Sequence, residues 1–155
     1  IRVPLIISMP GTVKSARVPA LVELLDLPQT LLDAVGIEYH PGMLGRSLWP
    51  MLTGEAPVDH HRDDVYCEFY ADEFRKGNRV SPAANATMLR DKRYKLVMAH
   101  DSDEGELYDL ENDPGEHENL WDQESHDNDR CRMIARMARR IAHTADPLPA
   151  RLAPW

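Results

Sequence analysis

Short strand-like segments followed by one amphipathic helix constrain the fold of this chain more than any other feature. Residues 86–90 and 93–98 flank a two-residue turn, residues 106–110 form a further strand-like segment, and residues 64–70 alternate as a strand does. Three strands with one apolar face are the minimum for a stable antiparallel sheet. A final helix, predicted from about residue 127 to residue 143, has an apolar face that suits it to cover such a sheet. We therefore predict an antiparallel sheet packed by a C-terminal helix.

The N-terminal part of the chain predicts a strand and a short helix. Residues 3–8 form an apolar run that suits a strand buried on both faces. In residues 20–36, Asp26 and Gln29 resemble a capping box, and Gly36 stands where a glycine commonly ends a helix. An apolar stripe predicts that this helix docks by one face. The stripe consists of Leu27, Leu31, Leu32 and Val35.

Composition indicates a folded chain and excludes some classes of function. The 155 residues are 43% hydrophobic and 28% charged, which is typical of one globular domain, or of one domain with a piece of another. The formal net charge of −8 argues against nucleic-acid binding, which usually needs a basic patch. No apolar run approaches the roughly 18 residues of a membrane helix. Because the chain opens without Met and without a signal-like segment, we interpret it as truncated at its N-terminus.

One acidic segment resembles the start of a calcium-binding loop. It reads Asp109-x-Glu111-x-Asp113, but Pro114 stands where such a loop needs glycine, and Leu120 stands where it needs glutamate. We therefore interpret the segment as an acidic turn after a strand.

Two adjacent histidines, His60 and His61, are the other candidate for metal binding. Neighbouring residues on an extended chain point to opposite faces, so both imidazoles rarely reach one ion. We interpret them as solvated loop residues and assign no metal ligand to this chain.

The two cysteines do not form a recognisable catalytic pattern. Cys67 has neighbours that would raise its pKa, which favours a buried strand cysteine, and Cys131 lies beside two arginines with no apparent base. They fit either one bridge or two free thiols, so the sequence leaves the cellular compartment open. With no nucleophile elbow or phosphate-binding loop present, we assign no catalytic residue.

Residues 71–84 form a predicted loop that carries a basic group. Arg75, Lys76 and Arg79 could together hold a sulfate, phosphate or carboxylate. The alternative is a solvated loop in an acidic protein.

Five segments of the chain form a recognisable series. They are residues 2–11 (RVPLII followed by PG), 22–36 (a P-T-L-L-D-like helix with Pro28 one place early), 45–52 (GRSL), 89–96 (RYKL) and 106–120 (ELYDL followed by DP). In this order they resemble the C-terminal half of the sulfatase family, within the alkaline phosphatase superfamily. All five together, spanning residue 2 to about residue 121, are specific.

The resemblance implies an α/β fold in which a large mixed sheet holds the active site, with an α+β C-terminal part. Residues 1–63 would end the large catalytic domain, residues 64–145 would form a small antiparallel sheet with its helix, and residues 146–155 would be a tail. Family members hydrolyse sulfate esters with a formylglycine nucleophile, made from Cys or Ser in a C/S-x-P-x-R motif, beside a calcium-like ion. Neither Cys67 nor Cys131 lies in that motif, and the family's metal ligands lie upstream of the first strand. The full-length protein is thus expected to be a hydrolase, and this chain, with no catalytic residue or cofactor of its own, to be inactive alone.

The resemblance also implies that the small domain borders the substrate cleft. We select Glu68, Tyr70, Arg75 and Lys76 as rim candidates because they end a strand and enter a loop. A sulfate-ester substrate would be bound through the N-terminal part, with no nucleic-acid or membrane partner, and a homo-oligomer is left open. Two alternatives are a phosphonate or phosphodiester hydrolase of the same superfamily and a non-catalytic interaction module.

Overall fold

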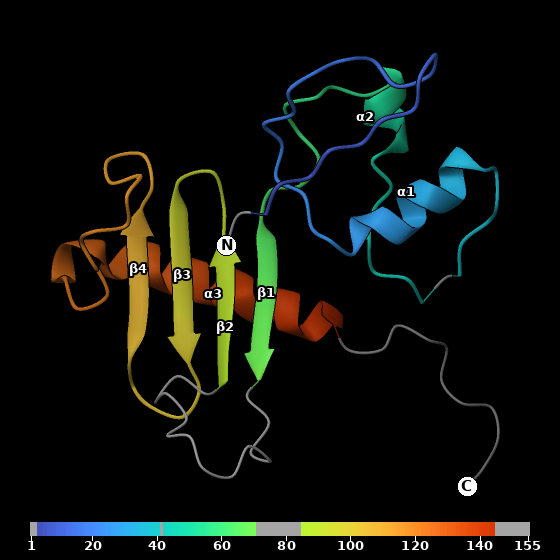
Figure 1. Ribbon diagram of the computed structural model, residues 1–155. Helices are drawn as coiled ribbons and strands as arrows, with labels where there is room; N and C mark the ends of the chain where they lie inside the picture. The colour runs from blue at the N-terminus through green and yellow to red at the C-terminus, as the bar shows by residue number, and fades with distance from the viewer. Residues whose placement is uncertain (1–2, 41, 71–84, 145–155) are drawn as a thin grey trace, which may run out of the picture. The chain divides into compact units, whose positions relative to one another are not determined.

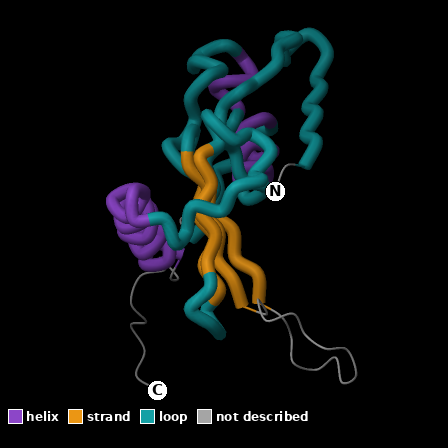
Figure 2. The backbone as a smooth tube through the Cα atoms, turned by 90° about the vertical axis from the view of Figure 1, so that its left-hand side faces the viewer, coloured by secondary structure: helices purple, strands orange, loops and turns teal. Residues whose placement is uncertain are grey.

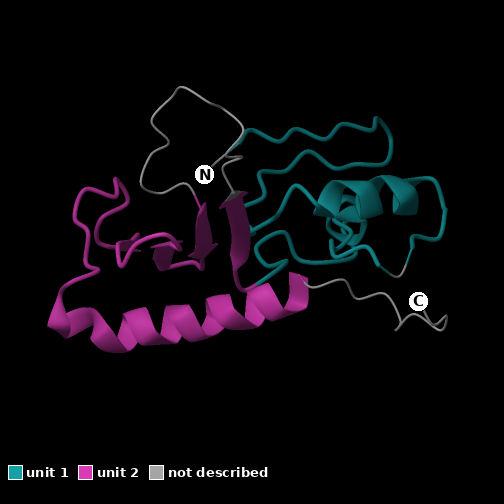
Figure 3. Ribbon diagram, turned by 90° about the horizontal axis from the view of Figure 1, so that it is seen from below, with its two compact units in different colours: residues 1–62, 150–155 teal, residues 63–149 magenta. Residues whose placement is uncertain are grey.

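The computed structural model describes residues 3–40, 42–70 and 85–144 (Figure 1). The chain divides into two compact units, one formed by residues 1–62 and the other beginning at residue 63 (Figure 3). We describe each unit by itself.

The second unit contains a four-stranded antiparallel sheet in the order β1-β2-β3-β4. The strands are β1 (Val65–Tyr70), β2 (Asn85–Arg90), β3 (Tyr94–Ala99) and β4 (Gly105–Asp109). All four strand-like segments of the sequence therefore form strands, each pairing with its neighbour along the chain.

One helix covers one face of this sheet. The 3-10 turn η1 (Glu124–His126) leads into α3 (Asp127–Thr144), which lies on one side of the strands in Figure 2. In the register of the sheet Leu89 lies opposite Leu96, and Leu96 lies opposite Leu107. These three leucines are completely buried, and Met133 and Met137 of α3 pack on them. The predicted α/β class, α+β in the C-terminal part, is confirmed.

Asp91 organises the turn between β2 and β3. Its Oδ1 accepts hydrogen bonds from the backbone N–H of Arg93 at 2.9 Å and of Tyr94 at 2.6 Å. Its Oδ2 accepts from Arg136 of α3 at 2.5 Å, and Arg136 also donates to Asp64 at 2.7 Å. Arg136 of α3 therefore attaches the helix to the sheet.

The first unit contains two short helices and a small core. Helix α1 (Asp26–Ala34) ends two residues before Gly36, whose positive φ of 69° matches the predicted glycine at the helix end. Helix α2 (Trp49–Thr53) contributes Met51 to a core that includes Ala20 and Leu48. No helix in the described part of the chain is long and apolar enough to cross a membrane.

The predicted strand at residues 3–8 does not form in this structure. These residues belong to no sheet, and 91% of the Ile6 surface is exposed. A strand needs a neighbouring strand to pair its backbone groups, and the described residues place none beside this segment. Only the next side chain, Ile7, packs against the small core of the unit.

The predicted docking of α1 by its apolar stripe holds only in part. Leu27 packs against the small core of the unit, and Leu32 is half-buried. The buried residues of the helix are Asp26, Gln29 and Thr30, whereas Leu31 and Val35 are 68% and 67% exposed. Asp26 is likewise no capping residue, because Leu25 occupies the cap position and makes no side-chain capping bond. Sequence periodicity located the apolar face correctly but could not tell whether this chain covers it.

Candidate functional site

The acidic segment after β4 is a hydrogen-bonded turn. The Asp109 side chain is buried and accepts hydrogen bonds from Arg93 Nη2 at 2.8 Å, from Asn112 at 2.9 Å and from the Glu111 backbone N–H at 3.1 Å. The hydrogen bonds from Arg93 contribute most to lowering the pKa of Asp109 from 3.8 to about 2. The oxygens of the Asp109 carboxylate accept hydrogen bonds from within the fold, so this carboxylate stabilises the turn.

Two further carboxylates after β4, those of Asp113 and Glu116, are also engaged within the fold. Asp113 Oδ2 accepts hydrogen bonds from the backbone N–H of His117 and Glu118, and the bond from Glu118 contributes most to lowering its pKa. Glu116 pairs with Lys95 of β3 and adopts a positive φ of 58°. Among the residues described, no group of three or more His, Cys, Asp or Glu side chains is arranged to hold a metal ion.

Asn119 covers the outer edge of β4. Its Oδ1 accepts a hydrogen bond from the Leu107 backbone N–H, and its Nδ2 donates to the Gly105 carbonyl, both at 3.0 Å. The Leu120 backbone N–H adds a bond to the Leu107 carbonyl at 2.8 Å. An edge strand otherwise presents unpaired backbone groups, so the ELYDL segment and its continuation form one structural element.

Glu68 and Tyr70, two of the four rim candidates, lie at the end of β1. Glu68 is exposed, and its Oε1 accepts a hydrogen bond from the Tyr66 hydroxyl at 2.8 Å. Tyr70 is the last residue of the strand and pairs in register with Asn85. Arg75 and Lys76 lie outside the described residues, so the structure does not bring the four candidates together.

Sequence reasoning missed two polar residues near Glu68. Thr87 is its register partner on β2, and Thr87 Oγ1 lies 3.1 Å from Nε2 of His100. A hydroxyl beside an imidazole resembles a nucleophile with its base. Thr87 is only 1% exposed, however, and its hydroxyl also contacts the sulfur of Met137, so it belongs to the core. No motif in the sequence signalled this pair.

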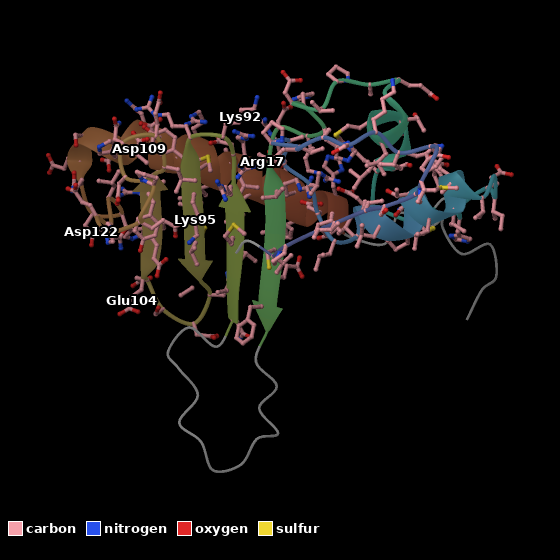
Figure 4. All side chains as sticks on the ribbon, turned by 45° about the horizontal axis from the view of Figure 1, so that its top comes forward. Arg17, Lys92, Lys95, Glu104, Asp109 and Asp122 are labelled. Carbon is pink, nitrogen blue, oxygen red and sulfur yellow. The ribbon has the colours of Figure 1, made fainter. Side chains whose placement is uncertain are left out.

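An acidic pocket of about 450 Å³ lies in the second unit beside β4. Among the described residues, its lining includes four carboxylates, from Asp103, Glu104, Glu106 and Asp122, and no basic residue. Figure 4 marks Glu104 and Asp122 on the β4 side of the sheet. A sulfate group would be repelled by these charges, so the pocket is unsuited to a sulfated substrate.

Trp121 also lines this pocket, but its ring already packs against other groups of the fold. A Cβ on Gly105 would lie 2.5 Å from the ring, so the glycine backbone packs directly against it. The guanidinium of Arg130 lies 5.5 Å from the ring centroid. Trp121 therefore stabilises the fold and offers no free stacking surface.

The first unit contains a buried ionic cluster around Asp26. Arg62 pairs with Asp26 and, at 2.7 Å, with Glu23, and all three side chains are buried. The Asp26 carboxylate also accepts hydrogen bonds from the backbone N–H of Glu23 at 2.9 Å and of Arg46 at 2.8 Å. The cluster holds the start of α1 against the segment that leads into α2.

His61 belongs to the same cluster, which corrects the expectation of two solvated histidines. His60 is exposed, but the His61 side chain is 10% exposed and its Nε2 lies 3.4 Å from Asp26. Burial is the largest cause of its lowered pKa. The neutral imidazole is therefore the favoured form near neutral pH.

An apolar groove of about 540 Å³ also lies in the first unit. Its lining residues come mainly from residues 3–22 and from α2, and the charged ones are Lys14 and Arg17. The described residues that line it include no carboxylate and no histidine, so they offer no general base for hydrolysis.

Both cysteines are free thiols. Cys67 is half-buried, where a buried strand cysteine was expected, and Cys131 is exposed on α3. Of the two arrangements that the sequence left open, the structure has the unbridged one.

Comparison with protein families decides the relationship of this chain. The family model described as "N-sulphoglucosamine sulphohydrolase, C-terminal" matches residues 1–143. The chain belongs to this family of sulfatase C-terminal domains. The predicted resemblance to sulfatases is thereby confirmed.

Individual sulfatases show the same relationship. The chain is 32% identical to an N-acetylglucosamine-6-O-sulfatase of Bacteroides thetaiotaomicron, over 77% of this chain and 21% of that protein. It is 30% identical to arylsulfatase K of Rattus norvegicus, over 76% of this chain and 21% of that protein. This sulfatase C-terminal domain thus spans about a fifth of the length of the curated relatives it matches.

Solved structures of sulfatases also match this chain, and so does the structure of an enzyme with a different activity. A 2-O GAG sulfatase matches 78% of this chain and 25% of its own, with a TM-score of 0.66 and 28% identity. A phosphonate monoester hydrolase from Silicibacter pomeroyi matches 79% of this chain and 25% of its own, with a TM-score of 0.66 and 31% identity. The C-terminal fold is therefore shared between sulfatases and phosphonate hydrolases.

Proposed function

We propose that this chain supplies the C-terminal part of a sulfatase that hydrolyses sulfate esters. The observation that carries the proposal is the family match over residues 1–143. Sulfatases from bacteria and vertebrates match the same region. Residues 1–63 would complete the large catalytic domain, and residues 64–145 would form the small one.

We propose further that the reaction takes place on residues outside this chain. The formylglycine and divalent ion implied by the family do not fit the residues present here. Neither cysteine lies in a C/S-x-P-x-R motif, and the carboxylates after β4 are bonded to backbone N–H groups and to basic side chains. We therefore derive no chemical step through either group in this chain.

The role left for the second unit is to border the substrate. Glu68 and Tyr70 lie where β1 ends, and Arg75 and Lys76 follow in sequence. Arginine and lysine can hold a sulfate, and a carboxylate held by a tyrosine can accept bonds from sugar hydroxyls. We propose these four as substrate-selecting residues of the complete protein.

A phosphonate monoester hydrolase is the second candidate. The similarity to the Silicibacter pomeroyi enzyme favours it, at 31% identity. Sulfate monoesters and phosphonate monoesters both present an anionic tetrahedral group, so the C-terminal part alone could serve either.

The isolated 155-residue chain is expected to show no turnover of 4-nitrophenyl sulfate or of a phenyl phosphonate ester in the presence of calcium. The physical reason is that the described residues contain no activated nucleophile. Release of nitrophenol or phenol is measured, with an arylsulfatase as the positive control for the sulfate ester and the Silicibacter pomeroyi phosphonate monoester hydrolase for the phosphonate ester. Turnover well above background by the isolated chain would contradict the proposal that the chemistry lies elsewhere.

A further inference from the structure

Of the titratable side chains in the ionic cluster around Asp26, His61 is the one that ordinarily titrates near neutral pH. Its neighbour His60 is exposed, whereas the His61 side chain is 10% exposed. The Nε2 atom of His61 is buried, and Asp26 Oδ2 lies 3.4 Å from it, farther than an ordinary hydrogen bond. A proton taken up by His61 therefore enters the cluster and is not shared with solvent.

The two carboxylates of the cluster are already engaged when His61 is neutral. Asp26 Oδ1 accepts hydrogen bonds from Arg62 and, at 2.8 Å, from the Arg46 backbone N–H. Asp26 Oδ2 accepts the backbone N–H of Glu23 at 2.9 Å, and the Glu23 carboxylate is paired with Arg62 at 2.7 Å. A protonated His61 would thus lose the hydration of its charge without a vacant carboxylate oxygen to replace it.

Charged groups from several segments act on His61. Asp26 of α1 attracts its proton, whereas Arg62 and Arg46, which follows α1 in the chain, repel it. The two carboxylates, of Asp26 and Glu23, balance these two guanidinium groups, so protonation of His61 gives the cluster a net positive charge. Burial is the largest cause of the lowered pKa of His61, the Asp26 carboxylate opposes it, and the two arginines add to it.

The same cluster joins α1 to the segment that leads into α2. The Arg46 N–H is bonded to the Asp26 side chain, and the Leu48 N–H is bonded to Thr30 Oγ1 at 2.8 Å. Leu48 is buried in the small core of the first unit together with Met51. Contacts of Asp26 and Thr30 therefore hold the chain that carries this core.

We propose that His61 and Asp26 form an acid-sensitive latch, in which protonation of His61 favours release of α1 from residues 46–48. In the unfolded chain His61 has its ordinary pKa of 6.5, so the unfolded chain binds the proton more readily than the folded unit. The stabilising contribution of neutral His61 is therefore present above about pH 6.5 and is lost as the pH falls below that value. The first unit is suited to a neutral medium and opens more readily in an acidic one.

Hydrogen exchange of two backbone amides tests the latch directly. The N–H groups of Arg46 and Leu48 exchange when α1 is released, because their acceptors lie on that helix. Uptake of one proton changes an opening equilibrium by at most about tenfold per pH unit. Between about pH 7.5 and about pH 5.5 we expect their protection factors, corrected for intrinsic exchange, to fall by about tenfold.

The internal control is the Leu107 N–H of β4, which is bonded to the side-chain amide of Asn119 and so has an acceptor that does not titrate. Its protection factor should stay unchanged over the same range. No loss of protection at Arg46 and Leu48, or an equal loss at Leu107, would overturn the proposal.

Substitution of the histidine separates the latch from other effects of acid. His61→Gln keeps a polar side chain that does not titrate, so the protection of Arg46 and Leu48 should change by less than about twofold over the same range. The matched control is His60→Gln, which should keep the wild-type dependence because its side chain is exposed. A dependence in His61→Gln equal to that of the wild type would show that another group is responsible and would overturn the proposal.

An NMR titration of the wild-type chain covers the case in which His61→Gln does not fold. The imidazole resonance of His61 is followed in the folded chain and in the chain unfolded by urea. We expect a lower midpoint in the folded chain. An equal or higher midpoint there would mean that the folded cluster accepts the charged imidazole, which would overturn the proposal.

Discussion

Replacing Asp26 with alanine should destabilise the first unit by about 3–5 kcal/mol, because it removes one of the two carboxylates that pair with the buried Arg62. Arg62 is 3% exposed, so water cannot take the place of the carboxylate. The backbone N–H groups of Glu23 and Arg46 would lose their acceptor as well. The expected loss is large for one side chain, since a whole domain is commonly stable by only 5–15 kcal/mol.

Urea unfolding followed by tryptophan fluorescence measures this effect. Trp49 lies in α2 and reports on the first unit, and a background with Trp121→Phe and Trp155→Phe removes the other two tryptophan signals. The matched control is Asp33→Ala on the same helix, which should change the free energy of unfolding by less than about 0.5 kcal/mol. An equal effect of both substitutions would show that the ionic cluster does not stabilise the unit.

Leu96→Ala should destabilise the second unit by about 2–5 kcal/mol. Leu96 is completely buried at the centre of the sheet, between Leu89 and Leu107 in register. The neighbouring strands are held by backbone hydrogen bonds and cannot close the resulting cavity. The expected loss therefore includes the cavity as well as the lost apolar burial.

The control for this prediction is Phe69→Ala in the same sheet. Phe69 is 61% exposed, so its removal should cost less than about 1 kcal/mol despite its larger volume. Both variants are measured by urea unfolding with Trp121 as the reporter. A loss below 1 kcal/mol for Leu96→Ala would contradict the assignment of this leucine to the core.

The sheet and its helix were predictable because their signals are local. Strand alternation, the Asp91 turn and the apolar face of α3 can each be seen within a few residues, and each element packs on its neighbour along the chain. The exposure of most of residues 3–8, and of Leu31 and Val35 on α1, could not be predicted in the same way. Burial depends on which residues pack there, and of these side chains Ile7 packs against the core of the unit while Leu31 and Val35 stay exposed.

The candidate site was predictable only in part. The end of β1 at Glu68 and Tyr70 followed from a strand pattern that meets a loop signal. The burial of His61 beside Asp26 depends on two segments 35 residues apart in sequence, which no spacing rule connects. The same holds for Thr87 and His100, which come together only through pairing of β2 with β3.

The most direct test of the central claim is the intact mass of the native protein, with peptide mapping of any sequence that precedes Ile1. The account predicts a much longer polypeptide that contains a C/S-x-P-x-R peptide with the mass of formylglycine at its first position. A native chain of 17.7 kDa that begins at Ile1 would contradict it and would favour a non-catalytic interaction module.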